Sequence, residues 1–226
     1  MVCHRLPYIG AFRTGTRVIA TMTPRIEGPH KHVLPQGTIL YRVHRMYRAP
    51  VDFNTSVAEA TSRGGRFDST SEEQFPYYYA ASSVRAALFE VFLNEHEYPS
   101  DLVPRNAVRD RIVSAVRLTV DAAVAALVDE RDFEAAGQSE DLVTMDRTHY
   151  AETRQWVKSL RRSASWAQGV IWRPLRDNDS RSVILFGDRF DDNPLRAETA
   201  YSRNLDDDDN FRWLLDQLSE GQSESR

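Results

Sequence analysis

One carboxylate interrupts an apolar stretch of this chain, FPYYYAASSVRAALFEVFLN at residues 75–94. The pattern predicts a helix over about 78–94. At roughly 100° per residue, Tyr79 and Glu90 lie on one flank of this helix, with small Ser and Ala side chains between them. An acid beside such a groove can reach a ligand, whereas an acid wedged into the core incurs a desolvation penalty. Alternatively, Glu90 only pairs with an arginine at the edge of the core.

Two upstream motifs could meet this carboxylate. LYRVHR, residues 40–45, has the pattern of a strand, in which successive side chains point to opposite faces of the sheet. If Tyr41 faces the core, Arg42 therefore faces a cleft or solvent. RGGRFD, residues 63–68, has two glycines, which allow unusual backbone angles and the close approach of a ligand. Taken singly, each motif has a simpler interpretation, a solvated arginine and an ordinary loop.

The surrounding chain alternates between strand and helix patterns, and residues 49–71 resemble a loop. We predict strands at 37–45, 110–119, 169–172 and 182–189, and helices at 78–94, 147–163 and about 211–218. Asp121 is expected to cap a short helix after the second strand. These elements predict one α+β domain with a small central β-sheet flanked by helices. We assign this domain to 37–200, after a flexible leader at 1–36 and before an acidic tail at 201–226.

Composition narrows the class of protein. The chain has 226 residues, of which 41% are hydrophobic and 27% charged, as expected for one globular core. No run approaches the roughly 20 apolar residues that span a bilayer, and the N-terminus lacks the apolar block of a secretory signal. We therefore expect a cytoplasmic protein that does not enter membranes.

Metal ions and nucleic acids are unexpected ligands. Cys3 is the only cysteine, and the six histidines form no HExxH motif, so we expect no metal site. Arginine is abundant, yet the formal net charge is -4, which argues against direct nucleic-acid binding. The acidic run at 206–209 could attract a basic partner or could simply be a solvated charged segment.

Four segments, considered together, carry a resemblance. LYRVHR, GGRFD, YYYAASSVRAALFEV and GVIW…VILFGDR follow one another in order between about residues 37 and 190. In order and spacing this chain resembles the RES domain family, named for its Arg, Glu and Ser. The resemblance implies an ADP-ribosyltransferase-like fold and the role of toxin in a bacterial toxin–antitoxin pair. It also implies NAD as the substrate, no metal, and an Xre-type antitoxin as partner, and it leaves open whether the chain forms a homo-oligomer.

The resemblance also implies roles for individual residues. As the bond between nicotinamide and ribose breaks, Glu90 would stabilise the positive charge on the ribose, and Arg42 would bind the pyrophosphate. Tyr79 would contact the nicotinamide–ribose end, although on an ideal helix it lies roughly 16 Å from Glu90. The other residues expected to line the pocket are Tyr77, Gly65, Arg66 and Ser182.

The chain departs from the family pattern at the serine. It should follow the GVIW strand, where WRPL instead places Pro174, which offers neither a hydroxyl nor an amide donor. Ser180 or Ser182 could substitute for it. If neither does, the chain would be a degenerate domain that binds a partner without catalysis. We rank NAD degradation, with water or phosphate as the acceptor, ahead of ADP-ribosylation of a protein.

Overall fold

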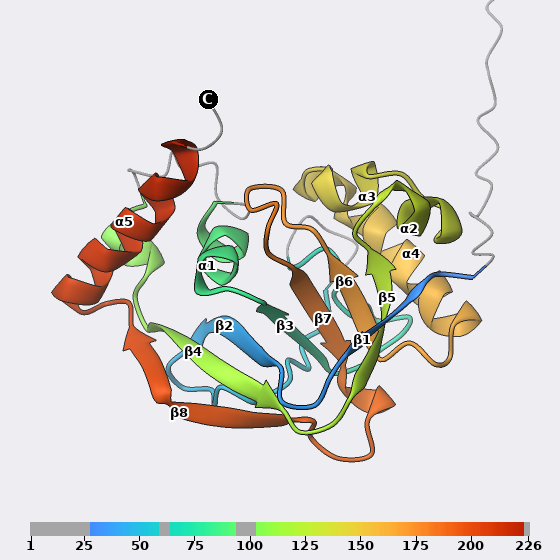
Figure 1. Cartoon of the computed structure of the whole chain (residues 1–226), viewed down its shortest axis with the longest axis horizontal. Helices are drawn as coiled ribbons and strands as arrows, with labels where there is room; N and C mark the ends of the chain where they lie inside the picture. Colours follow the sequence, from blue (N-terminus) through green and yellow to red (C-terminus); the bar gives the residue numbers. More distant parts are fainter. Residues whose placement is uncertain (1–27, 59–63, 94–102, 224–226) are drawn as a thin grey trace, which may run out of the picture.

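Eight strands form one curled mixed sheet, which positions every element of the candidate site (Figure 1). The computed structural model describes residues 28–58, 64–93 and 103–223. The strands are β1 (Lys31–Leu34), β2 (Ile39–Arg45), β3 (Tyr77–Ala81), β4 (Arg111–Leu118), β5 (Ala122–Leu127), β6 (Gly169–Trp172), β7 (Ser182–Phe186) and β8 (Leu195–Asn204). Their order is β1-β5-β6-β7-β3-β2-β4-β8. The β5–β6 pair is parallel, and the other neighbouring strands are antiparallel.

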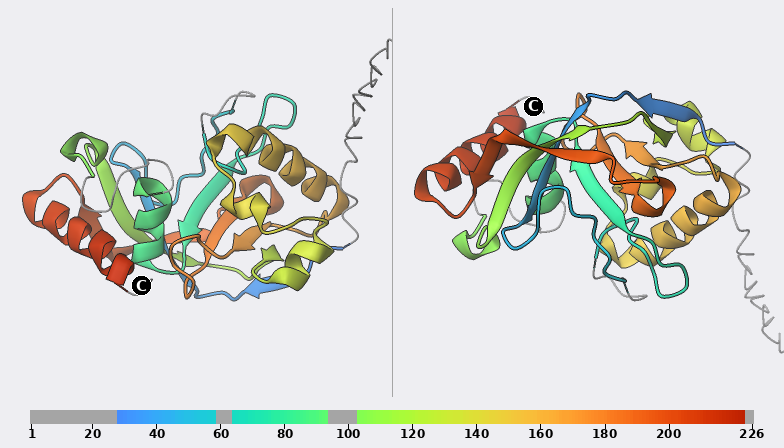
Figure 2. Two further views of the ribbon diagram at one scale, coloured as in Figure 1. Left: turned by 90° about the horizontal axis from the view of Figure 1, so that it is seen from above. Right: turned by 90° about the horizontal axis from the view of Figure 1, so that it is seen from below.

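The helices gather at the two ends of the sheet. They are α1 (Val84–Phe92), α2 (Glu130–Ala135), α3 (Asp141–Thr144), α4 (Tyr150–Ser163) and α5 (Asp208–Ser223). In Figure 1, α1 and α5 lie at one end, and α2, α3 and α4 lie at the other. Both views in Figure 2 show α5 beside α1, and the two helices are in contact. Among the described residues, none of the helices combines the length and the apolar character needed to cross a bilayer.

Alternation along the strands separates two apolar layers. The inner face of the curled sheet holds Tyr78, Ile171 and Leu185, together with side chains from the other strands. The opposite face is covered by helices: α4 packs there on strands β3 and β5 to β7, while α1 and α5 pack beside β4. Because neighbouring residues point to opposite faces, Tyr77 and Tyr79 lie on the helix-covered side while Tyr78 lies inside.

The predicted helix over 78–94 is wrong in its first part. Residues 77–81 form β3, which pairs with β7, because consecutive aromatic side chains pack well on a pleated sheet. Helix α1 begins only after Ser83, whose backbone is extended and whose hydroxyl accepts a bond from the Ala86 N–H at 3.0 Å. Tyr79 and Glu90 therefore belong to different elements joined by a tight connection.

The sheet is also larger than the small sheet that we expected. Strand β1 lies within the segment assigned to the leader, of which residues 1–27 fall outside the described part. Asp121 caps no helix: its carboxylate accepts a bond from the Gln36 N–H at 2.7 Å, and residues 122–127 form β5. This alanine-rich segment is a strand because it is paired on both sides, by β1 and by β6. Strand β8 crosses residue 201, where we placed the start of the tail.

Other predicted elements are confirmed. The strands near 37–45, 110–119, 169–172 and 182–189 correspond to β2, β4, β6 and β7, and α4 forms after a short 3₁₀ turn over Arg147–His149. The acidic run at 206–209 leads into α5, where negative charge favours the first turn of a helix. Asp206 and Asp208 are both within ion-pair distance of Arg105. The run is thus part of the fold.

Candidate active site

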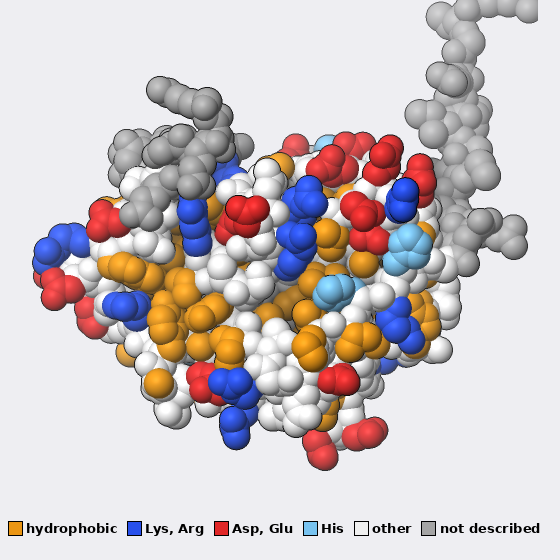
Figure 3. Space-filling view, in the orientation of Figure 1, with side chains coloured by type: hydrophobic (Ala, Val, Ile, Leu, Met, Phe, Trp, Pro, Cys, Tyr) orange, Lys and Arg blue, Asp and Glu red, His pale blue; other side chains and the backbone are white. Residues whose placement is uncertain are grey.

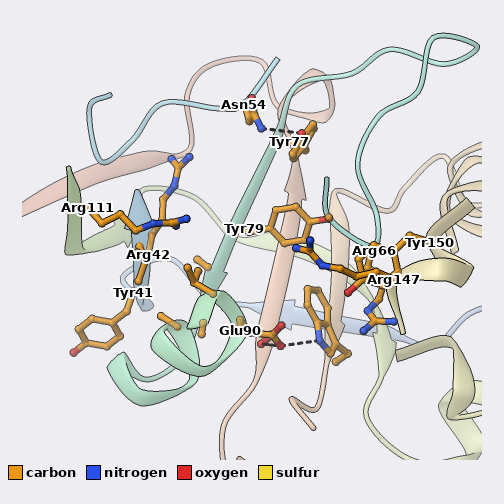
Figure 4. Close-up of a pocket in the computed structure, with 18 residues that line it drawn as sticks. Tyr41, Arg42, Asn54, Arg66, Tyr77, Tyr79, Glu90, Arg111, Arg147 and Tyr150 are labelled. Atoms are coloured by element: carbon orange, nitrogen blue, oxygen red, sulfur yellow. Dashed lines mark hydrogen bonds between the residues drawn. The ribbon is translucent and has the colours of Figure 1, made fainter. Parts of the chain in front are cut away.

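A pocket of about 220 Å³ opens on the helix-covered side of the sheet, between α1 and the start of α4 (Figure 4). Strands β2, β3, β6 and β7 contribute to its lining. Every residue expected at the site lines it: Arg42, Gly65, Arg66, Tyr77, Tyr79, Glu90 and Ser182. The first and last of these residues lie 140 positions apart in the sequence, so the fold alone brings them together.

Glu90 lies at the centre of this arrangement, on α1 (Figure 4). Its Oε1 accepts a hydrogen bond from the Ser182 hydroxyl at 2.7 Å and another from the Trp172 indole N–H at 3.3 Å. Ser182 and Trp172 are directly opposite one another on β7 and β6, so both side chains reach the same oxygen from one face of the sheet. Glu90 is half-buried and lines the pocket, as an acid that meets a ligand must.

Tyr79 presents its ring to the pocket, while its hydroxyl is engaged elsewhere. The hydroxyl oxygen accepts a bond from the Phe67 N–H at 2.8 Å. The ring lies 6.3 Å from that of Trp172 in an edge-to-face contact. The separation of roughly 16 Å expected for one helix does not apply, because Tyr79 lies on β3 and Glu90 on α1. Trp172 contacts both residues. Burial, followed by the charge of Asp68, raises the pKa of Tyr79, so its phenol is neutral.

Tyr77 supplies a second phenol further along the same face. Its hydroxyl accepts a bond from the Asn54 amide at 2.8 Å and lies 3.1 Å from the Ser56 hydroxyl. Burial also raises the pKa of Tyr77. Neither Tyr77 nor Tyr79 can act as a base near neutral pH. Glu90 is the one carboxylate among the lining residues, so it is the group that can carry negative charge there.

The glycine turn, residues 64–68, leaves no room for a side chain at its second glycine. Gly64 has a φ of +90°, a conformation that side chains disfavour. The Gly65 N–H donates to the Asp68 carboxylate at 2.7 Å, and its carbonyl accepts from Nε of the buried Arg154 at 3.1 Å. A Cβ on Gly65 would lie 2.6 Å from Asp68 Oδ1 and 2.9 Å from the Tyr79 hydroxyl. Only glycine fits there without a shift of the turn.

Arg42 lines the pocket, and so does its neighbour Tyr41, although the two side chains leave opposite faces of β2. Its Nη1 donates to the Asp52 carbonyl at 2.5 Å and to the Pro50 carbonyl at 3.4 Å. The guanidinium carbon lies 4.3 Å from the centroid of the Tyr78 ring. Burial lowers the pKa of Arg42, but an arginine remains charged at any physiological pH. Its position is thus set by the 50–52 loop and by an aromatic ring.

Several lining residues were absent from our sequence-based set. They are Tyr41, Asn54, Arg111, Arg147, Tyr150 and Trp172. Arg42 and Arg111 lie on one side of Glu90, and Arg66 and Arg147 lie on the other (Figure 4). Four arginines and one glutamate are therefore among the lining residues. No local pattern marks Arg111 or Arg147, whereas Trp172 could have been suspected from its place in GVIW, beside the missing serine.

The two serine alternatives are now separated by their contacts. Ser182 reaches Glu90, whereas the Ser180 hydroxyl donates to Asp177 at 2.7 Å and lies 2.8 Å from that of Ser83. Ser180 thus fastens the β6–β7 loop to the start of α1. Pro174 is buried and is not among the lining residues.

The groups at this pocket are suited to an organic anion. Within residues 28–58, 64–93 and 103–223, no cluster of three or more His, Cys, Asp or Glu side chains could hold a metal ion. Basic and acidic side chains are mixed on the face shown in Figure 3, which has no continuous basic surface. Four arginines line the pocket itself.

Known proteins show the family to which this chain belongs. A family model for the RES domain matches residues 39–213. The chain belongs to the RES domain family. No curated protein matches the sequence. The RES domain is similar in fold to a chain in the crystal structure of the M. tuberculosis MbcT–MbcA toxin–antitoxin complex. The TM-score is 0.60 at 17% identity, with 83% of this chain and 92% of that chain covered. The predicted resemblance and the single α+β domain are confirmed.

Proposed function

We propose that this RES domain is a bacterial toxin that breaks the nicotinamide–ribose bond of NAD. The observation that carries the proposal is the setting of Glu90: one carboxylate, oriented by Ser182 and Trp172, in a pocket lined by aromatic rings and four arginines. A cationic pocket with a single acid suits a ligand that is anionic at its phosphates and develops positive charge at its sugar.

The chemistry assigned to Glu90 follows from the leaving group. When nicotinamide departs, positive charge develops on the ribose, and a nearby carboxylate stabilises this oxocarbenium-like state. The same carboxylate can accept a bond from a ribose hydroxyl. Because the pKa values of Tyr77 and Tyr79 are raised, their rings would pack against the nicotinamide–ribose end as neutral groups.

The arginines would hold the phosphates. A guanidinium forms paired bonds with phosphate oxygens. Arg42 donates to the Pro50 and Asp52 carbonyls through Nη1, and we expect its remaining N–H groups to contact the pyrophosphate. Arg66 donates to the Leu142 and Met145 carbonyls at 3.1 Å, which would fix it as a pocket wall. The volume of about 220 Å³ is small for a whole dinucleotide, so we expect the adenosine end to extend beyond the pocket.

Ser182 would take the part of the serine for which the family is named. Pro174 occupies the usual position in the sequence, but the Ser182 hydroxyl reaches Glu90 from the neighbouring strand. This contact favours an enzyme over a degenerate binding domain. As a toxin, the protein would act in the cytoplasm, where NAD is abundant, and an Xre-type antitoxin would obstruct the pocket.

The decisive experiment incubates the purified protein with NAD, with and without phosphate, and resolves the products. We expect free nicotinamide together with ADP-ribose, or with its phosphorylated form when phosphate is the acceptor. Glu90→Gln should lower the rate at least about a hundredfold, because the charge that stabilises the transition state is lost. The matched control is Glu130→Gln, an exposed glutamate on α2 outside the pocket, which should retain full activity.

Expression in bacteria tests the cellular role. We expect growth arrest that disappears with Glu90→Ala or Arg42→Ala and is relieved by co-expression of a small helix-turn-helix protein encoded beside this gene. NAD left intact under both phosphate conditions would overturn the proposed chemistry. ADP-ribose retained on a protein would instead identify a transferase, and arrest that survives Glu90→Ala would favour a binding domain.

A further inference from the structure

We infer that Trp172 is a positioning residue for Glu90, acting together with Ser182 to set the plane of the carboxylate; this inference rests on the proposed function. Trp172 lies at the end of β6, and its indole N–H donates to Glu90 Oε1 at 3.3 Å. Ser182, its direct partner on β7, donates to the same oxygen at 2.7 Å. Both bonds therefore restrain one atom of the acid.

Two donors restrain this acid more than one because of how a glutamate side chain rotates. The last torsion of glutamate, around the bond to the carboxylate carbon, has no sharp preference. One donor to Oε1 restrains that atom along a single direction. A second donor that arrives from the neighbouring strand restrains it along another direction, and together they favour one plane of the carboxylate. The Ser182 bond is short and the Trp172 bond is long. The Ser182 bond is therefore the stronger one, and the main effect of the Trp172 bond is to orient the carboxylate.

The indole is itself held on its other sides. Its ring contacts Phe67 edge-to-face at 5.4 Å and Tyr79 at 6.3 Å. The Phe67 N–H in turn bonds the Tyr79 hydroxyl. The glycine turn, β3 and β6 thus meet at Trp172, and they hold its N–H toward Glu90. Trp172 is 4% exposed, so solvent does not compete strongly for this donor.

The test compares two tryptophan-to-phenylalanine variants. Trp172→Phe removes the N–H and keeps an aromatic ring. Trp156→Phe is the matched control, because the Trp156 N–H also donates at 3.3 Å, to the Ala136 carbonyl, in the buried core away from the pocket. We expect kcat for NAD cleavage to fall about tenfold in Trp172→Phe, with KM nearly unchanged, since loss of a bond to a charged group has this magnitude. The control should keep its kcat.

A double variant and a spectrum complete the test. Trp172→Phe combined with Ser182→Ala should lower kcat by a factor different from the product of the single effects, because both donors act on one oxygen. The chain has four tryptophans, so a ¹H–¹⁵N spectrum should show four indole signals. The signal lost in Trp172→Phe should shift in Glu90→Gln and in Ser182→Ala, whereas the Trp156 signal should not.

The outcomes separate this inference from the proposed function. An unchanged kcat in Trp172→Phe, or an indole signal unmoved by Glu90→Gln, would overturn the positioning role. Wild-type protein that leaves NAD intact would overturn the proposed chemistry alone. In that case, growth arrest replaces kcat as the readout, and a Trp172→Phe variant as toxic as wild type would reject the inference.

Discussion

At the scale of single residues, a side chain's neighbours decide which of its atoms can act. The Tyr79 hydroxyl accepts a bond from the Phe67 N–H, which fixes the position of the ring that lines the pocket. Glu90 shows the converse case. Its Oε1 is engaged by Ser182 and Trp172, and these bonds orient the acid within the pocket.

Gly65 is the residue whose enlargement should be least tolerated near the site. In Gly65→Ala the new methyl group would lie 2.6 Å from Asp68 Oδ1 and 2.9 Å from the Tyr79 hydroxyl. The turn must then shift, and we expect the free energy of unfolding to fall by about 1–3 kcal/mol. Because Tyr79 would move with the turn, NAD turnover should also fall. Urea unfolding and a turnover assay measure the two effects, and wild-type values in both would show that the turn adapts freely.

At the scale of elements, β2 joins the site to the far side of the sheet. Arg42 and His44 point to the same face of this strand, and His44 is buried. Its Nε2 lies 2.9 Å from the Ser114 hydroxyl on β4, and its Nδ1 lies 3.0 Å from the Arg45 carbonyl. A neutral imidazole satisfies both contacts, with Nδ1–H as the donor and Nε2 as the acceptor.

The stability of the β2–β4 pair should therefore depend on pH. Burial lowers the pKa of His44 below its ordinary value of 6.5. In the unfolded chain His44 titrates normally, so below this pH the unfolded state binds more protons than the folded state. The free energy of unfolding should therefore decrease as the pH falls from about 6.5 toward the lower folded pKa. Above that window His44 is neutral in both states, and its contribution is constant.

Urea unfolding between pH 7.5 and 5 measures this dependence. The variant His44→Gln keeps a polar side chain but does not titrate, so its stability should change less over the same range. Parallel curves for the two proteins would show that His44 is protonated equally in the folded and unfolded states.

At the scale of the whole molecule, one arginine connects α4 to the segments on either side of the site. The Arg161 side chain is 4% exposed and bonds Glu73 at 3.0 Å and both oxygens of Asp188 at 3.2 and 2.7 Å. Its guanidinium carbon also lies 3.9 Å from the centroid of the Phe75 ring. Glu73 precedes β3, and Asp188 follows β7, so this group fastens both central strands to α4.

Arg161→Met should destabilise the whole domain. The substitution leaves two carboxylates close together without their shared cation, and we expect a loss of about 2–3 kcal/mol in the free energy of unfolding. This is less than for a fully buried pair, because Asp188 is 41% exposed. The control is Arg162→Met, whose side chain is 66% exposed and bonds Glu73 at 3.3 Å. It should cost less than about 1 kcal/mol, and equal losses in the two variants would contradict the role of Arg161.

The sequence by itself determined most local elements and the chemical types at the site. Alternation and apolar stripes indicated β2, β4, β6, β7 and α4, and the order of four motifs indicated the RES family. Local patterns failed where pairing decided the outcome. Residues 78–81 and 122–127 suit a helix when considered alone, but each becomes a strand because neighbouring strands satisfy its backbone on both sides.

Only the tertiary structure decided how the site is assembled. Glu90 was identified as a lone acid, but its partners Ser182 and Trp172 lie 92 and 82 positions away and converge because β6 and β7 pair in one register. No sequence motif around Arg111 or Arg147 distinguishes either residue from an ordinary surface arginine. Side chains distant along the chain meet only when the sheet curls and α1 packs on it, and this packing makes Glu90 the centre of a pocket.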